Sequence, residues 1–530
     1  MAVSISNFNS NKSMKIKNIR IAMVALAGFL SINAGLAQVT NTDYFMETSY
    51  LRNSLNPALR PDQGYLVLPI LPNIGVNVQT NTFNLDNLTF KGLNGNRVTF
   101  MHPSISADQF LSNLSTDNYL NTDVNVKLLG VGFYSGDNFW NIDLGIRTHI
   151  DANIPKSFFG LLKKGFDQNS QSLYDLSDLS ATGYSFVELG IAHSRPFLNN
   201  SLIAGVRVKL LGGIADFDLH AKSLSIDAGP DYWRAKSEVT LGGSAPGVIA
   251  KYDEKGNLDG FDFGDFGMPG YGAGLDLGAV YDFKDATPGL NRLKVSAALN
   301  DIGFISWSKN NSLSMRSPAT EVTITPSSLS SQDGASLSDV LEDAFDDIRE
   351  AVNLREDKQS GRTTALRMHM MLGAEYEIFK HRLSVGALYS NRFGNYFNKS
   401  EFTVSANARL SRFISTSFSY SFMHSKFDTF GFALHLAPTR GINLFLASDY
   451  AVPHVNSEFI PTTSKAINFQ MGISIPLGSK KSTKKVSTEV DDIDTSMKEN
   501  AAEPAESIEE GESTETIVKE NPSEEEAGNE

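Results

Sequence analysis

The chain contains no cysteine, and after its N-terminus it contains no apolar run long enough to form a membrane-spanning helix. Without cysteine there can be no disulfide bond, no thiolate metal ligand, no cysteine nucleophile and no lipid-bearing cysteine of a lipoprotein. A spanning helix needs about 18 or more apolar residues. This chain could therefore cross a membrane only with strands whose backbone groups are all paired.

Recognisable enzyme motifs are absent as well. The sequence has no HExxH element, no Gly-x-Ser-x-Gly element and no P-loop, and its nine histidines are scattered. The aspartates Asp259, Asp262 and Asp265 in a glycine-rich stretch match no EF-hand spacing, so a solvated loop is favoured and calcium binding is the alternative. We expect a protein that is not an enzyme, with no cofactor and no metal site.

Most of the negative charge lies at the end of the chain. Residues 479–530 contain 16 acidic and 6 basic residues and so carry -10 of the net charge of -14. Their composition buries too little apolar surface to become ordered, which predicts a disordered, acidic periplasmic tail. A basic periplasmic protein could dock on this tail, and no nucleic-acid partner is expected.

The N-terminus has the pattern of an export signal. Three basic residues precede an apolar run at 21–30, and small residues at 35–37 suit a signal-peptidase site. We predict a signal peptide at 1–37 that is cleaved after Ala37, with Met14 as an alternative start of translation. A retained membrane anchor is the alternative interpretation. The basic residues are Lys15, Lys17 and Arg20.

Fourteen segments alternate apolar and polar residues with the period of a β-strand. In the last of them every second residue from Ile467 to Leu477 is apolar. The segment lengths suit tilted strands that cross the hydrocarbon layer. The predicted strands are 65–79, 122–134, 139–150, 183–193, 201–212, 270–283, 292–300, 364–379, 382–391, 401–410, 413–423, 427–436, 441–450 and 466–477.

The connections between the first eight segments alternate in length. Long connections such as 213–269 and 301–363 follow odd-numbered segments, whereas short ones such as 380–381 follow even-numbered segments. Outer-membrane barrels have long loops outside the cell and tight turns in the periplasm. We therefore predict an all-β protein, a single transmembrane antiparallel β-barrel at 65–478 in the cell outer membrane. A soluble two-sheet sandwich would explain neither the alternation nor the export signal.

Charged residues occur on the polar faces of these segments. A Lys or Arg that faces lipid near the bilayer centre costs about 2–4 kcal/mol. We therefore expect the polar faces to line the lumen and the apolar faces to contact outer-membrane lipid, with aromatic girdles at the segment ends. The predicted lumen-lining residues are Asp143, Arg147, Arg207, Lys209, Asp276, His369, Glu375, Glu377 and Arg409.

Two further segments lie outside the strands. Residues 38–64 are polar and contain prolines that no internal strand position accommodates, which predicts an N-terminal periplasmic or hatch segment. Residues 337–352 have apolar residues at helical spacing, which predicts a helix in the fourth long connection. We expect this helix to pack on the outer mouth of the barrel, and a partner-binding helix is the alternative.

Three motifs resemble a known group of barrels. Asn56, Pro57 and Ala58 form an Asn-Pro-Ala segment similar to that near the mature N-terminus of FadL-like outer-membrane barrels, to which the PorV-type barrels of the type IX secretion system are related. Residues 270–281 (GYGAGLDLGAVY) and 299–307 (LNDIGFISW) resemble strand motifs of a Bacteroidota family that is labelled as a domain of unknown function.

This resemblance covers roughly residues 43–478 and implies about fourteen strands, an N-terminal hatch shaped by the Asn-Pro-Ala turn, and passage of hydrophobic molecules. The charged lumen faces favour instead a plugged or polar interior. Two functions remain open: a FadL-like transporter or channel for an unidentified small molecule, and a structural or secretion-associated scaffold. The scaffold would bind periplasmic or surface protein partners through its outer loops and its tail.

Overall fold

The computed structural model describes residues 40–479 with internal gaps. Internal contacts divide the chain into Met1–Lys480 and Lys481–Glu530, and all described residues belong to the first unit. The predicted signal peptide, the helix predicted at 337–352 and nearly all of the predicted tail lie outside the described residues, so they remain predictions. The gaps are 71–72, 92–95, 165–171, 229–232, 253–257, 265, 318–319, 325–353, 358–360, 395–397, 424–425 and 452–465.

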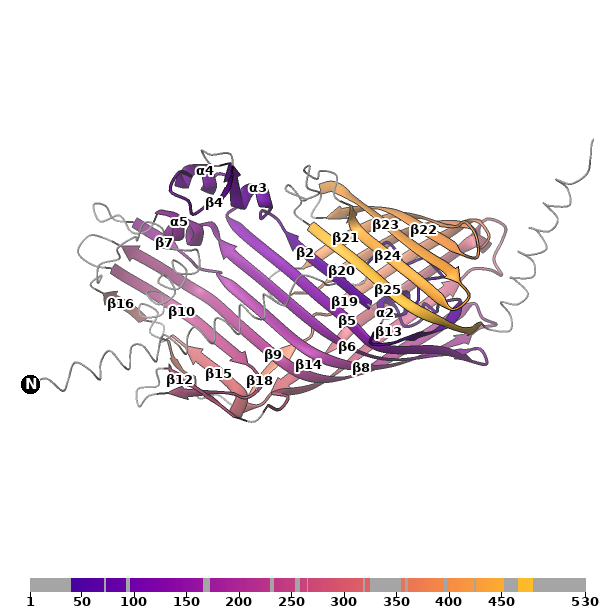
Figure 1. Cartoon of the computed structure of the whole chain (residues 1–530), viewed down its shortest axis with the longest axis horizontal. Coiled ribbons are helices and arrows are strands. Elements are labelled where there is room, and N and C mark those ends of the chain that lie inside the picture. The colour runs from indigo at the N-terminus through magenta and orange to yellow at the C-terminus, as the bar shows by residue number, and fades with distance from the viewer. Residues whose placement is uncertain are drawn as a thin grey trace, which may run out of the picture. The chain divides into compact units, whose positions relative to one another are not determined.

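Fourteen antiparallel strands close a barrel, which confirms the predicted fold class. The first strand is interrupted, and both of its parts pair with the second strand and with the last, so that the sheet has no open edge (Figure 1). The strands are β1 (Gln63–Val67) with β2 (Asn73–Thr80), β5 (Asp117–Ser135), β6 (Asn138–Pro155), β8 (Ser180–Phe197), β9 (Leu202–Ala228), β13 (Gly270–Asp282), β14 (Leu293–Trp307), β19 (His369–Phe379), β20 (Leu383–Arg392), β21 (Lys399–Arg409), β22 (Ile414–Met423), β23 (Lys426–Thr439), β24 (Ile442–Ala451) and β25 (Ala466–Ser479).

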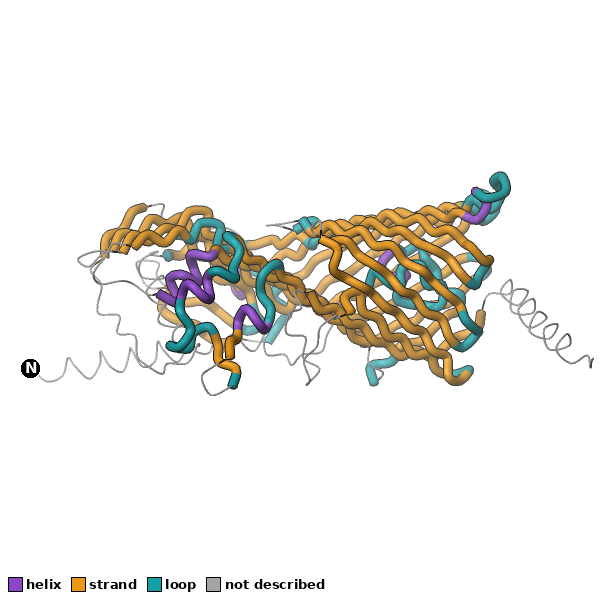
Figure 2. The backbone as a smooth tube through the Cα atoms, turned by 90° about the horizontal axis from the view of Figure 1, so that it is seen from above, coloured by secondary structure: helices purple, strands orange, loops and turns teal. Residues whose placement is uncertain are grey.

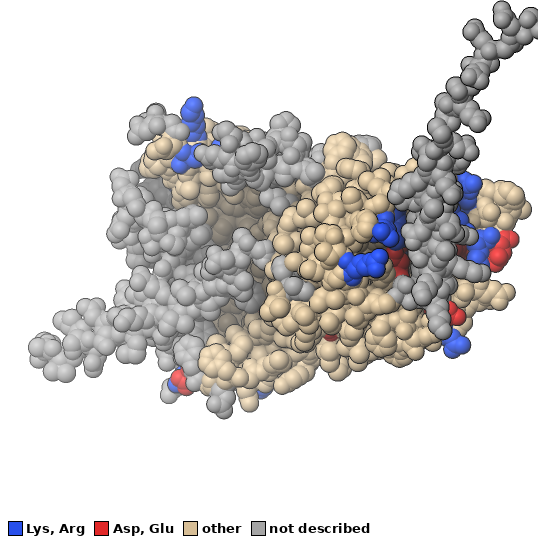
Figure 3. All heavy atoms as spheres, turned by 45° about the vertical axis from the view of Figure 1, so that its right-hand side comes forward, with Lys and Arg blue, Asp and Glu red and all other residues tan. Residues whose placement is uncertain are grey.

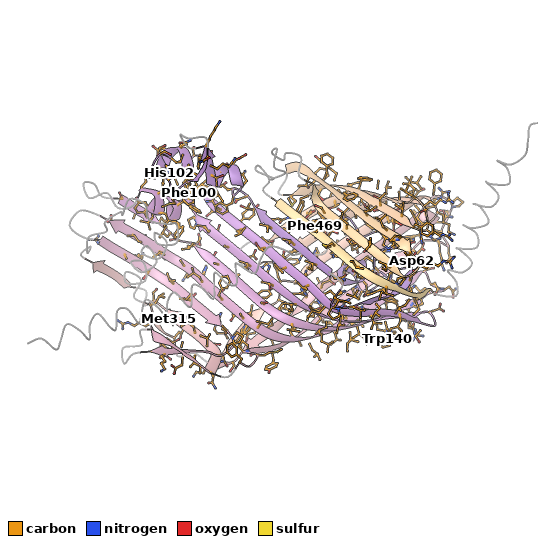
Figure 4. The ribbon with its side chains drawn as sticks, in the orientation of Figure 1. Asp62, Phe100, His102, Trp140, Met315 and Phe469 are labelled. Carbon is orange, nitrogen blue, oxygen red and sulfur yellow. The ribbon has the colours of Figure 1, made fainter. Side chains whose placement is uncertain are left out.

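The barrel wall is polar inside and apolar outside, as the period-2 pattern predicts. On β21, Glu401 and Thr403 are buried while Phe402 and Val404 are each 43% exposed. Figure 4 shows Trp140 and Phe469 on the barrel wall, and they are 36% and 41% exposed. An apolar exterior around a polar lumen is the arrangement expected of a barrel surrounded by lipid.

The interruption of the first strand separates β1 from β2, where the sequence predicted one segment at 65–79. Pro69 lies in the interruption, and proline cannot donate a ladder hydrogen bond. Asn73 compensates in part, because its side-chain Nδ2 donates to the backbone oxygen of Ile473 at 2.9 Å. Ile70 in the interruption is 84% exposed.

The two ends of the barrel differ. At one end, here called the turn end, short hairpin turns join the strands; at the other, the loop end, strands run on beyond the barrel (Figure 1). Strand β9 has 27 residues, far more than the segment 201–212 that its alternation predicted. The additional elements are α3 (Leu85–Leu88), β3 (Thr89–Lys91), β4 (Arg97–Thr99), α4 (Ala107–Leu111), α5 (Lys156–Lys164), β7 (Ser172–Asp175), β10 (Trp233–Ser244), β11 (Val248–Tyr252), β12 (Leu258–Phe263), β15 (Ser312–Arg316), β16 (Thr320–Ile324), β17 (Arg355–Glu356) and β18 (Arg362–Ala365).

These loop-end elements have apolar cores of their own. One cluster gathers around the fully buried Phe110, which stacks on Phe100 with ring centroids 4.2 Å apart. A second cluster contains Leu224 and Val239 from β9 and β10. The sequence pattern did not indicate these cores. No helix that the structure describes is both long and apolar enough to span a membrane.

Residues 40–62, here called the plug, lie inside the barrel at its turn half. The plug contains the short helix α2 (Arg52–Leu55), which Figure 2 shows surrounded by strands. Two further apolar clusters join plug residues such as Tyr44 and Leu51 to the inner faces of the strands. Asp62, where the plug leads into β1, lies at the turn end, opposite Phe100 at the loop end (Figure 4).

Candidate functional site: a plugged and charged lumen

Hydrogen bonds to one carboxylate hold the first residues of the plug. The backbone N–H groups of Asn41 and Thr42 donate to the two carboxylate oxygens of Asp449, each at 2.8 Å. The Thr42 hydroxyl donates to the same carboxylate at 2.7 Å, and Ser417 donates to the Thr42 backbone oxygen at 2.8 Å. A loop without regular structure thus finds partners for its backbone polar groups inside the lumen.

The Asn-Pro-Ala turn packs against two glycines of the wall. Asn56 Oδ1 accepts from the backbone N–H of Ala58 at 2.9 Å, and Asn56 Nδ2 donates to the Ala297 backbone oxygen at 3.2 Å. A Cβ atom on Gly278 would lie 2.0 Å from Asn56 Oδ1, and one on Gly205 would lie 2.4 Å from the Pro57 carbonyl carbon. Two of the motifs recognised in the sequence, the Asn-Pro-Ala segment and 270–281, therefore meet here.

Eight charged side chains in the lumen are connected by ion pairs. We call this set the lumen network. Arg147 makes a two-point contact with Asp301 at 2.6 and 2.8 Å and also contacts Glu188 at 3.0 Å. Lys209 contacts both Asp276 at 2.7 Å and Asp301 at 2.6 Å. The members are Lys127, Asp143, Arg147, Glu188, Arg207, Lys209, Asp276 and Asp301.

The network has equal numbers of cations and carboxylates, and six strands contribute to it. Arg207 contacts Asp143 at 3.1 Å and also reaches the plug, because it donates to the side-chain oxygen of Asn53 at 3.2 Å. Asp301 has a φ of 61°, and its backbone N–H donates to Asp276 at 2.7 Å. Buried charges need such pairing, since an isolated ion in a low-dielectric interior costs several kcal/mol.

The nine residues predicted to line the lumen fall into two groups in the structure. Five of them, Asp143, Arg147, Arg207, Lys209 and Asp276, belong to the network. The other four have separate partners: His369 bonds Ser390 at 2.8 Å, Glu375 accepts from Ser384 at 2.6 Å, Glu377 pairs with Lys294 at 2.8 Å, and Arg409 pairs with Asp62 at 2.8 Å. Any role of these residues in passing a solute remains a prediction.

The sequence analysis missed three members of the network. Glu188 lies on the polar face of a predicted strand, so the same alternation that indicated Asp143 indicates it too. Asp301 follows the predicted end of a strand and lies within the recognised motif 299–307. Lys127 is next to a bulge between β5 and β6, where the alternation shifts by one residue. No local pattern predicts such a shift.

A second buried cluster lies nearer the loop end. Both ring nitrogens of His149 face carboxylates, with Nδ1 at 2.7 Å from Asp123 and Nε2 at 2.9 Å from Asp151. Asn121 donates to Asp151 at 2.7 Å. A carboxylate on each nitrogen favours the doubly protonated imidazolium, which then acts as a structural cation between the two acids.

At the turn end the plug is joined to the wall by charges. Lys294 contacts Glu47 of the plug at 3.1 Å, and its positive charge holds the pKa of Glu47 well below the usual value. The Glu47 carboxylate, which accepts from the imidazole of His381, in turn raises the pKa of His381. Glu47, Glu377 and His381 are close enough to share a metal ion, but Lys294 pairs with both carboxylates and so already supplies a positive charge.

A cavity of about 110 Å³ lies between the plug and the lumen network. Its lining combines apolar side chains of the plug and of β2 with charged side chains of the wall. Lining residues on opposite sides include Leu51, Ile74, Lys127, Arg147 and Arg392. The cavity therefore has both polar and apolar walls and is bounded on one side by the plug.

Comparison with known proteins gives a family and several distant folds. Residues 57–449 match the family described as "Family of unknown function (DUF5723)". No curated protein sequence matches.

Among solved structures, a mutant TodX monoaromatic hydrocarbon channel is 9% identical, with coverage of 84% of this chain and 95% of that chain and a TM-score of 0.36. The toluene transporter TbuX of Ralstonia pickettii is 9% identical, with 84% and 95% covered and a TM-score of 0.33. A FadL homologue of Pseudomonas aeruginosa is 11% identical, with 84% and 97% covered and a TM-score of 0.34.

Proposed function

The chain belongs to the family of unknown function DUF5723, and for this member we propose the role of an outer-membrane barrel that passes a small polar solute through its lumen. One observation carries the proposal: residues 40–62 lie inside the turn half of a charged lumen and form one side of a cavity. These residues are not part of any strand of the barrel wall. The plug is thus a segment whose displacement would open a path.

The exterior supports the location in an outer membrane. Phe418, Phe430 and Val208 on the outer face are 60%, 58% and 51% exposed, which water would disfavour and hydrocarbon would not. Polar side chains on the same strands, such as Ser417 and Ser419, face the lumen instead. A barrel is one of the two architectures that leave no backbone group unpaired in lipid.

The lumen supports a polar solute. A hydrophobic molecule in the network would separate ions from their partners and from water without giving hydrogen bonds in return, which is costly. A solute with its own donors and acceptors can replace water beside Arg147 and Lys127, which keep 29% and 15% of their side-chain exposure. The apolar plug residues on the other side of the cavity would contact the solute's carbon skeleton.

The contacts of the plug are suited to release. Its links to Asp449, Arg207 and Asn300 are hydrogen bonds, and water can substitute for each. A neutral hydrogen bond contributes about 0.5–1.5 kcal/mol net, and one with a charged partner such as Asp449 or Arg207 about 1.5–3 kcal/mol, so a solute that competes for several of them can shift the plug. Apolar contacts of Tyr44 and Leu55 with the wall hold the plug in the absence of solute.

The experiment is solute uptake by liposomes that contain the purified chain. We expect a set of small polar solutes to enter faster through a variant that lacks residues 38–62, or through Asp449→Ala, than through the intact chain. The double variant Arg97→Ala and Asp86→Ala removes an exposed ion pair at the loop end and serves as the control. Equal permeability of all four proteins to every solute would exclude the transport role.

One observation favours a second role, that of a scaffold for protein partners. The apolar cores around Phe110 and Leu224 give the loop end a defined surface beyond the barrel. Such a surface suits binding of a surface protein, and the acidic segment 479–530 would add a periplasmic contact. Crosslinking followed by purification, with and without 479–530 and with and without the loop-end segment 84–116, tests this role. A set of crosslinked proteins that neither deletion alters would exclude it.

A further inference from the structure

The hairpin turns of the turn end have a strong excess of positive charge. The described turns that join β5 to β6, β8 to β9, β13 to β14, β19 to β20, β21 to β22 and β23 to β24, together with the end of β8, contain seven exposed basic side chains but only two exposed acids, Asp137 and Asp285. We call the basic set the rim (Figure 3). It consists of Arg195, Lys284, Arg292, Lys380, Arg382, Arg412 and Arg440.

The described acids closest to the rim already pair with other cations. The acids nearest to it lie toward the lumen and already have cationic partners, with Glu47 and Glu377 on Lys294 and Asp62 on Arg409. At the loop end, by contrast, several exposed lysines pair with acids, as in the contacts of Lys222 with Glu238 at 2.9 Å and of Lys251 with Asp262 at 2.7 Å. The excess positive charge is thus particular to the turn end among the described residues.

Exposed apolar side chains lie next to the rim, where the turns meet the barrel wall. Phe379, Leu410 and Leu198 in these turns are 62%, 69% and 65% exposed. The guanidinium of Arg195 lies 5.6 Å from the centre of the Phe197 ring, and that of Arg412 lies 4.7 Å from the Phe413 ring. Arginine beside aromatic side chains at the end of a spanning segment is typical of the level at which hydrocarbon meets lipid headgroups.

Arg195 shows which way the rim faces. On β8 the residues Glu188, Ala192 and Ser194 are buried in the lumen, whereas Leu189 and Ile191 are 37% and 43% exposed on the outer face. Arg195 continues the outer row and not the inner one, so it extends along the lipid-facing surface toward the headgroups.

From this arrangement we propose that the rim binds the phosphate groups of anionic phospholipids in the leaflet that surrounds the turn end. Guanidinium groups make two-point contacts with phosphate, and basic side chains near an anionic bilayer surface are each attracted to it. The rim extends over five of the six described turns, so it meets a surface that surrounds the barrel. An acidic protein would instead contact one side.

This inference rests on the membrane location proposed above and not on transport. The rim would fix the depth of the barrel in the bilayer and would gather anionic lipid around the turn end. Neither effect needs an open lumen.

The test uses the full chain in detergent, with bound lipids counted by native mass spectrometry against phosphatidylglycerol and phosphatidylcholine of the same acyl chains. We expect the intact chain to prefer phosphatidylglycerol by about tenfold, the scale that one or two basic side chains give at an anionic surface. The rim variant combines Arg195→Gln, Lys380→Gln and Arg440→Gln. The control combines Lys91→Gln, Lys222→Gln and Lys236→Gln, three exposed lysines of the loop end with the same change in charge.

The preference should fall to less than about threefold in the rim variant and stay unchanged in the control variant, because the three side chains removed from the rim outnumber the one or two that account for a tenfold preference. Insertion of each protein into phosphatidylcholine vesicles is measured beside it. If the intact chain fails to insert, the membrane location fails. If it inserts but shows no lipid preference, or if both variants lose the preference equally, only the rim proposal is overturned. Binding of soluble polyglutamate in place of phosphatidylglycerol would also overturn it.

Discussion

The barrel and the loop end of this chain are organised in opposite ways. In the barrel, serines and charged residues are buried and phenylalanines face outward, as with Ser417 at 0% and Phe418 at 60% exposure on one strand. At the loop end Phe110 is fully buried while charged residues such as Arg97 and Lys222 are exposed. The same residue types therefore take opposite positions within one polypeptide.

With the barrel in a membrane, as proposed above, the difference follows from the solvent that surrounds each region. In water, removal of apolar surface drives folding at roughly 25 cal/mol per Å², so the loop end forms an apolar core. Lipid provides no such drive between apolar surfaces, and the barrel is held by its ladder of backbone hydrogen bonds and by polar contacts in the lumen. Each of the following predictions compares a substitution in one region with a matched substitution in the other.

The largest effect is expected from a matched pair of phenylalanine substitutions. Phe110→Ala removes a fully buried ring at the loop end, and such a change typically costs about 3–5 kcal/mol. Phe418→Ala removes a ring that is 60% exposed on the barrel wall and leaves no cavity, so it should cost far less. Hydrogen exchange in detergent measures the loss of stability in each variant, at residues 100–114 for Phe110→Ala and at β22 for Phe418→Ala. Similar losses in the two variants would contradict the proposed reversal of the core.

A smaller effect is expected from Arg147→Ala in the lumen network. The substitution removes the nearest cation of Glu188 and one of the two cations of Asp301, which keeps Lys209, and loss of one partner of a buried pair costs roughly 3 kcal/mol at the lower end of its usual range. Arg97→Ala breaks the exposed pair with Asp86 and should cost about 0–1 kcal/mol. Unfolding of the barrel in denaturant and detergent, followed by gel mobility, compares the two. Equal midpoints would mean that the network adds nothing to stability.

Next in size is the turn of the plug. Asn56→Ala removes the bonds to Ala58 and Ala297 and leaves buried groups unpaired, at about 1–3 kcal/mol. The expected result is faster hydrogen exchange in 40–62 with the wall unchanged. Gly278→Ala, which places a Cβ against Asn56, should have the same effect from the other side. The control is Gly267→Ala, where no atom lies within 4 Å of the added Cβ and φ is outside the left-handed region. Slow exchange of the plug in both test variants would show that this contact does not hold it.

The smallest effect is a dependence of the plug on pH. The pKa of His381 is raised above 6.5 by Glu47, so its stabilising contribution is fully present below pH 6.5 and is lost as the pH rises through the folded-state pKa. The pKa of Glu47 is lowered below 4.5, so its contribution is present above pH 4.5 and is lost as the pH falls through the folded-state value. The hydrogen exchange rate of the Glu47 backbone amide, corrected for the intrinsic effect of pH on exchange, should be lowest between pH 4.5 and 6.5. In His381→Gln the rise above pH 6.5 should disappear, and an unchanged profile would contradict the assignment.

Much of the barrel was predictable from the sequence, because strand alternation is a local pattern. All fourteen predicted segments correspond to strands of the barrel, including β22, where the apolar residues from Ile414 to Phe422 mark one face. The same pattern indicated Arg147 and Lys209 as polar-face residues. It could not indicate Asp301, because the positive φ at that position and its contacts depend on the opposite strands. The loop-end strands were missed because their alternation serves two small cores and not one continuous wall.

The sequence alone therefore determined the alternation of faces, the number of strands and the sign of each charge, since all of these depend on residues close together along the chain. Only the tertiary structure decided that Asn56 lies against Gly278, that Arg147 pairs with Asp301, and that the turns of the rim surround one end. These contacts join residues more than 100 positions apart, and closure of the barrel brings them together. Their geometry follows from strand register and bulges, which no local pattern specifies.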